Sequence, residues 1–185
     1  MVDKAIEQII EIAESVVKPL GLCLVDARLG QQGRKRSLEV TIFRSGGPVG
    51  LADCEKVSRQ LEEMLDRQVP PLIDGPFLLE VQSPGIDRQL KTEREFAVFT
   101  GQAVEVKARE EIVGLGTVFA GTLKARSTDH LTIAQPRAIL PLRPGRAKAK
   151  PGAVHDLSQA AVGMEELEIE LTKLVSVRLL VEDKH

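Results

Sequence analysis

The 185-residue chain contains no tryptophan and no tyrosine, and it has only five phenylalanines. Proteins that bind single-stranded nucleic acid commonly stack bases on aromatic side chains, so this scarcity argues against a stacking platform. The chain also lacks a run of about 20 apolar residues, which a membrane-spanning helix requires. Its N-terminus is charged and amphipathic, unlike a signal peptide. We therefore expect no membrane partner and a cytoplasmic location.

Cysteine and histidine are scarce as well. Cys23 and Cys54 form no CxxC pair, and His130, His155 and His185 are scattered. Because protein metal sites draw on closely spaced ligands, we predict no metal site, and we expect both cysteines to be small buried residues in a reducing compartment. No Walker A loop, no GxGxxG and no nucleophile near a base is present. These absences predict no cofactor, no catalytic residue and no enzyme activity.

Strong overall charge is missing too, since the formal net charge is −2. No global field draws the chain to nucleic acid, so any such contact must be local. Two basic segments could neutralise phosphates: one between two expected strands and one in a long segment, 136–163, that has no acid before Asp156. Their cations are Arg34, Lys35, Arg36, Arg137, Arg143, Arg146, Lys148 and Lys150. The alternative for the first segment is a solvated turn, and the alternative for the second is a flexible insertion without a role.

The first half of the chain reads as a two-layer α-β-β-α-β domain over residues 1–91. Apolar residues at helical spacing predict helices over 3–18 and from 51 onward, and apolar and polar residues alternate over 23–29, 38–42 and 77–82. The loop 30–36 then connects the first two strands into a hairpin. Because each strand has one apolar and one polar face, both helices should cover the same side of a three-stranded sheet.

The second half has a different pattern, from which we place a second domain at 92–185. Thr92 and Glu95 form a capping box that opens a short helix. Five short strands without intervening helices follow, near 104–107, 117–124, 131–133, 167–171 and 175–179. This pattern predicts a small closed β-barrel, with Gly121 at a bulge or corner and with 136–163 as a basic insertion.

The stretch Leu-Glu-Val-Gln-Ser-Pro-Gly-Ile-Asp-Arg-Gln-Leu, residues 79–90, joins the two halves. Pro84 and Gly85 at the centre of Ser-Pro-Gly-Ile predict a type II turn, in which Gly85 takes a positive φ. In one interpretation Asp87 then caps the turn and Arg88 is solvated. In the other, the joint presents Ser83, Pro84, Gly85, Asp87 and Arg88 to a binding partner.

This stretch resembles the signature of the RimP family, the bacterial maturation factors of the small ribosomal subunit. The order of helices and domains is similar over nearly the whole chain, although Gln82 and Gln89 stand where many members carry Ser and Pro, and the basic insertion is a further departure. The resemblance implies an Sm-like or SH3-like barrel. It also implies binding to the immature 30S subunit, with contacts to small-subunit ribosomal protein twelve near the decoding centre and to 16S rRNA.

A free-standing Sm-like RNA chaperone is the alternative function. Such chaperones work as rings with a basic pore, whereas here the expected barrel is fused to another domain and its cations lie on an insertion that would obstruct ring packing. We therefore expect a monomeric assembly factor.

Overall fold

The computed structural model describes residues 2–33, 35–85, 87–139 and 164–180, except the side chains of residues 2, 3 and 32. The chain divides into two compact units, Met1–Pro84 and Gly85–His185. This division lies earlier than the boundary expected between Lys91 and Thr92. The boundary lies earlier because the residues just before Lys91 bond to the sheet of unit 2.

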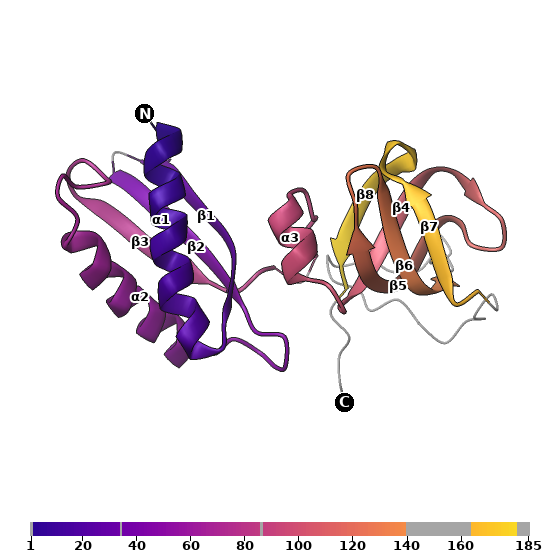
Figure 1. Cartoon of the computed structure of the whole chain (residues 1–185), viewed down its shortest axis with the longest axis horizontal. Coiled ribbons are helices and arrows are strands. Elements are labelled where there is room, and N and C mark those ends of the chain that lie inside the picture. The colour runs from indigo at the N-terminus through magenta and orange to yellow at the C-terminus, as the bar shows by residue number, and fades with distance from the viewer. Residues whose placement is uncertain (1, 34, 86, 140–163, 181–185) are drawn as a thin grey trace. The chain divides into compact units, whose positions relative to one another are not determined.

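Unit 1 is a three-stranded sheet with two α-helices (Figure 1). Its elements are α1 (Val2–Val17), the short 3-10 helix η1 (Lys18–Leu20), β1 (Cys23–Gln32), β2 (Lys35–Phe43), α2 (Leu51–Asp66) and β3 (Phe77–Gln82). The central strand β2 pairs antiparallel with β1 and parallel with β3. This order confirms the predicted α-β-β-α-β arrangement.

One apolar core joins the two helices to the sheet of unit 1. Buried residues of α1, such as Ile9, and of α2, such as Leu61, cluster with Leu38, Val40 and Ile42 of β2. The three β2 residues alternate along the strand and so point to one face of the sheet. Both helices therefore cover that face, as the sequence predicts, and burial of this apolar surface holds the two layers together.

A bulge in β1 overturns one prediction made from the sequence. The pairing with β2 shifts between Leu24 and Asp26, so Val25 is an extra residue in the strand. Leu24 thereby turns into the core, and Cys23 is exposed instead of buried. Cys54 on α2 is half-buried and packs against the core. Strict alternation failed here because one inserted residue exchanges the two faces of a strand.

Unit 2 is an antiparallel sheet preceded by one short helix (Figure 1). Its elements are α3 (Glu93–Val98), β4 (Ala103–Ile112), β5 (Gly116–Arg126), β6 (His130–Ala138), β7 (Glu166–Glu170), the 3-10 helix η2 (Leu171–Lys173) and β8 (Leu174–Leu179). The strand order is β7-β6-β5-β4-β8. Fully buried residues such as Phe119, Leu123, Leu131 and Ile133 form its core.

The closed barrel expected from the sequence is not confirmed. Among the described strands, no ladder joins β7 to β8, so the five-stranded sheet remains open. The predicted irregularity at Gly121 is confirmed, since the β5–β6 register shifts between Ala120 and Thr122. A Cβ atom at Gly121 would lie only 2.3 Å from Cγ2 of Ile133. Glycine is therefore required there by the close approach of β6.

Candidate functional site

The segment that follows the joint is part of the sheet of unit 2. The Leu90 N–H donates to the Val177 carbonyl oxygen at 2.8 Å, and the Leu179 N–H donates to the Arg88 carbonyl oxygen at 2.9 Å. Gln89 forms an isolated antiparallel bridge with Arg178 between these two bonds. Residues 88–90 thus extend the sheet beyond β8, which explains why the chain divides before this segment.

Arg88 is held by a buried carboxylate. Its Nε and Nη2 atoms lie 2.8 Å and 2.7 Å from Oε1 of Glu95, the third residue of α3. The Arg88 side chain is 17% exposed and that of Glu95 only 2%. Both interpretations of the joint treated Arg88 as an exposed cation, and that premise is wrong. A guanidinium paired in this way fixes the 88–90 segment to the start of α3.

Glu95 also completes the capping box predicted from the sequence. Its Oε2 accepts from the backbone N–H groups of Lys91 at 2.8 Å and Thr92 at 2.9 Å, while the Glu95 N–H donates to Oγ1 of Thr92. Burial by itself would raise the pKa of Glu95. The backbone donors at Thr92 and Lys91, together with Arg88, outweigh burial and hold the pKa below its ordinary value. The carboxylate is therefore charged in the folded protein at neutral pH.

The turn at the joint differs from the predicted one. The φ angle of Gly85 is not in the left-handed region, so Gly85 does not occupy the third position of a type II turn. Instead, the Arg88 N–H donates to the Gly85 carbonyl oxygen at 3.1 Å, which places the turn at Gly85–Arg88. Ser83, Gly85 and Asp87 are exposed and Pro84 is half-buried. Arg88, the fifth predicted partner-binding residue, is half-buried and its side chain is ion-paired with Glu95.

The first basic segment is shorter and less concentrated than expected. The β1–β2 ladder runs out to Gln32 and Lys35, so the predicted loop 30–36 is mostly strand. Lys35 and Arg36 are adjacent strand residues, and they point to opposite faces of the sheet. Arg36 lies 3.6 Å from Asp74. Both cations are exposed, but they do not form one patch, and Arg34 lies outside the described residues.

The second basic segment begins later than predicted. Pro136 and Arg137 belong to β6, where Arg137 pairs with Ala120 of β5 and is half-buried. Arg137 is therefore part of the sheet and not of an arm. Arg143, Arg146, Lys148 and Lys150 lie outside the described residues.

Comparison with known proteins places this chain in a family. The family model described as the RimP N-terminal domain matches residues 12–87. A protein of Microcystis aeruginosa named Ribosome maturation factor RimP is 36% identical over 135 residues, which are 73% of this chain and 85% of that protein. A protein of the same name from Rippkaea orientalis is 42% identical over 106 residues, or 57% of this chain and 68% of the relative. The chain belongs to the RimP family.

The RimP N-terminal match spans most of unit 1 and ends at Asp87, inside the turn that opens unit 2. It ends just before the Arg88–Glu95 pair, which lies wholly within unit 2. Within the described ranges, no three His, Cys, Asp or Glu side chains gather in a way that could hold a metal ion. None of the described helices has the length and apolarity needed to cross a membrane.

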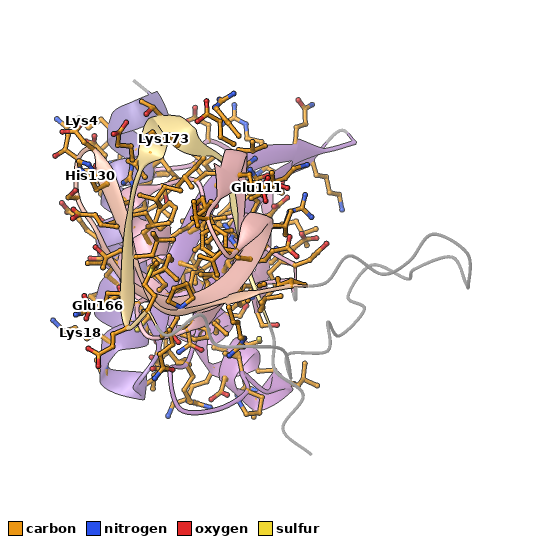
Figure 2. The ribbon with its side chains drawn as sticks, turned by 90° about the vertical axis from the view of Figure 1, so that its right-hand side faces the viewer. Lys4, Lys18, Glu111, His130, Glu166 and Lys173 are labelled. Carbon is orange, nitrogen blue, oxygen red and sulfur yellow. The ribbon has the colours of Figure 1, made fainter. Side chains whose placement is uncertain are left out.

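Unit 2 of this RimP-family chain also has an acidic groove, which the sequence reasoning missed. A cavity of about 360 Å³ lies between β7 and the second half of β4. It is lined by Ala108, Glu110, Glu111, Ile112, His130, Leu167, Glu168, Ile169, Glu170 and Lys173, and we call it the β7 groove. Figure 2 shows His130 and Lys173 near one end of β7 and Glu166 at the other. The alternation Glu-Leu-Glu-Ile-Glu over 166–170 was the available signal, since it places three carboxylates on one side of a strand.

Proposed function

We propose that this chain is a non-catalytic ribosome maturation factor that binds the immature 30S small subunit and assists its assembly. The observation that carries the proposal is its similarity to proteins named Ribosome maturation factor RimP, one of which it covers over 85% of the length. The proposed partners are 16S rRNA and small-subunit ribosomal protein twelve near the decoding centre. The protein would act as a monomer in the cytoplasm.

In this proposal, the joint contacts the partner through its exposed part. Ser83, Gly85 and Asp87 are accessible, and Pro84 limits the backbone angles of the first residues. Arg88 has a positioning role, because its guanidinium is occupied by Glu95 and fixes where the turn ends.

Basic residues supply the proposed contact with rRNA phosphates. Lys35 and Arg36 are exposed on unit 1, and Arg143, Arg146, Lys148 and Lys150 lie in the basic insertion within residues 136–163 of the proposed second domain. Phosphate contacts release counterions, so subunit affinity should fall steeply with salt. Replacing the four insertion cations with alanine should weaken binding and flatten this dependence. Unchanged affinity and salt slope would leave the insertion without a role in RNA binding.

We also propose that unit 2 is an Sm-like or SH3-like module. Its support is the five antiparallel strands among the described residues, of which β7 and β8 are joined by a short 3-10 helix. The alternative of a free-standing Sm-like chaperone is less favoured. Ring formation would pair the β7 edge of one copy with the opposite sheet edge of the next copy, and at that edge residues 88–90 already bond along β8.

Sedimentation of cell extract through a sucrose gradient tests the proposed function directly. The protein should comigrate with free small subunits and be absent from complete ribosomes. Its presence on complete ribosomes, or only at the top of the gradient after mild crosslinking, would overturn the assembly-factor proposal.

A further inference from the structure

Strand β7 lies at one edge of the sheet in unit 2. Among the described strands, β7 pairs only with β6. The Gln135 N–H donates to the Glu165 carbonyl oxygen, and the Leu171 N–H donates to the Asp129 carbonyl oxygen. Backbone bonding alternates in an antiparallel ladder, so the odd-numbered residues of this register bond to β6. The N–H and C=O groups of Glu166, Glu168 and Glu170 consequently point away from β6, toward the free edge.

The second half of β4 forms the opposite wall of the β7 groove. Its ladder with β5 skips from the Lys107–Val118 pair to the Ile112–Gly116 pair, so residues 108–111 leave the ladder there. The floor between the walls is apolar, since Ala108 and Ile169 are both 5% exposed. A channel with strand backbone on each side and an apolar floor has the shape that an extended peptide requires.

The charge of the groove selects the kind of peptide. Four carboxylates line it, from Glu110, Glu111, Glu168 and Glu170, against the single ammonium of Lys173. Lys173 already lies 3.2 Å from Glu170 and lowers the pKa of that carboxyl through this hydrogen bond. Glu110, Glu111 and Glu168 have no cation within ion-pair distance among the described residues. The groove therefore attracts cations and repels phosphates.

We propose that the β7 groove binds an extended basic segment of a protein partner, which adds to the free edge of β7 as a further strand. Lysine or arginine side chains at alternate positions of the segment would face the glutamates, and small apolar residues between them would face Ala108 and Ile169. Such segments occur in proteins that bind nucleic acid through basic arms. The inference rests on the proposed function, in which the immature small subunit supplies such a protein.

A second copy of this chain fits the groove poorly, because pairing two β7 edges would bring two glutamate rows together. RNA fits poorly as well, because the groove would repel its phosphates. Both are outcomes that the experiment can detect.

The test measures binding of a short fluorescent peptide, in which lysine alternates with valine, to the full-length protein by anisotropy. A control peptide has the same composition with its lysines and valines in separate blocks, which keeps the charge but destroys the alternation. The alternating peptide should bind at least several-fold more tightly. Equal affinities would show that charge alone attracts the peptide and would overturn strand addition.

Matched variants locate the site. Glu110→Lys combined with Glu168→Lys should weaken peptide binding about tenfold or more, because each replaces an attraction with a repulsion. Glu11→Lys combined with Glu62→Lys changes the net charge equally on exposed helix positions of unit 1 and should leave binding within about twofold. If the first variant does not fold, the corresponding double glutamine variant replaces it, with a smaller loss expected. Equal effects from the groove and control variants would overturn the assignment.

Backbone amide exchange then tests the strand geometry. On peptide binding, the amides of the even-numbered residues Glu166, Glu168 and Glu170 should gain protection, while Leu167 and Ile169 already bond to β6 and should change little. Protection without this alternation would contradict the inference, as would protection of the same amides by a single-stranded RNA oligonucleotide added without the peptide. Dimerisation of the unliganded protein through β7 would contradict it too.

Failure of this inference is separable from failure of the proposed function. If the groove variant comigrates with small subunits as well as the unmodified protein and the peptide does not bind, the groove inference fails and the proposed function stands. If the unmodified protein does not comigrate with small subunits, the proposed function fails whatever the peptide does.

Discussion

The two units contain the same local device in two different environments. In unit 1, Asp53 is the third residue of α2, accepts from the Gly50 N–H at 3.0 Å and pairs with Arg44 at 2.8 and 2.9 Å. In unit 2, Glu95 is the third residue of α3, accepts from the Thr92 N–H and pairs with Arg88. In each arrangement a carboxylate lies at the positive end of the helix dipole and links the helix to an arginine from outside it.

The environments differ in burial and in what else holds each helix. The Arg44 and Asp53 side chains are 34% and 25% exposed, against 17% and 2% for Arg88 and Glu95. Helix α2 has 16 residues and a buried stripe of Val57, Leu61 and Leu65, whereas α3 has only six residues. A short helix gains little from its own backbone bonds. The same ion pair should therefore matter much more in unit 2.

Loss of Arg88 should have the largest effect. Arg88→Ala leaves a buried carboxylate without its charged partner, and breaking such a pair typically costs about 3–5 kcal/mol. We expect the free energy of unfolding of unit 2 to fall by about 3 kcal/mol, with unit 1 unchanged. Urea unfolding followed by methyl NMR signals of each unit measures this difference.

Arg88→Lys serves as the control, because it keeps the charge but loses the fork that spans Nε and Nη2. The free energy of unfolding of unit 2 in Arg88→Lys should lie between that of the unmodified protein and that of Arg88→Ala. A loss below about 1 kcal/mol for Arg88→Ala would mean that the backbone donors alone satisfy Glu95, and the contrast between the units would disappear.

The pH dependence of stability sharpens the same contrast. The folded pKa of Glu95 lies below its ordinary value of 4.5 because backbone donors and Arg88 outweigh burial. A lowered folded pKa means that the unfolded state binds the proton more readily. The stabilisation is therefore present above pH 4.5 and is lost as the pH falls from there through the folded pKa. Over this pH range, the free energy of unfolding of unit 2 should change less in Glu95→Gln than in the unmodified protein. The same dependence on pH in both proteins would contradict the assignment to Glu95.

The more exposed pair, Arg44 and Asp53 in unit 1, should give a smaller effect. Arg44 and Asp53 remain in contact with solvent, which screens their interaction, and the buried stripe holds α2 in place without them. Arg44→Ala should lower the midpoint of thermal unfolding less than Arg88→Ala does. High salt should diminish the loss caused by Arg44→Ala more than the loss caused by Arg88→Ala. An Arg44→Ala effect as large as that of Arg88→Ala would refute the role given to burial.

These two pairs also show which contacts the sequence could predict. The capping box of Thr92 and Glu95 was predictable, because its residues lie three positions apart and their types are specific for it. The pairing of Arg88 with Glu95 was not, because it depends on the path of the chain along β8. The bulge at Val25 was not predictable either. Apolar residues stand on both sides of it, so the local sequence does not mark where the extra residue lies. The alternation in β2 was reliable because one of its faces is wholly buried.

Gly85 should show the smallest effect, although the type II turn predicted from the sequence would have given it a positive φ. Its φ is not left-handed, and a Cβ atom there would meet only Oδ1 of Asp87, at an ordinary contact distance of 3.7 Å. Gly85→Ala should therefore change the free energy of unfolding by less than about 0.5 kcal/mol. Gly101→Ala is the matched control, because Gly101 has a φ of 86° and the change should cost about 1 kcal/mol or more. If Gly85→Ala instead destabilises unit 2 as much as Gly101→Ala, the turn at Gly85–Arg88 constrains the backbone more than its φ indicates. If stability is kept but comigration with small subunits is lost, the exposed backbone of the joint acts in binding and not in folding.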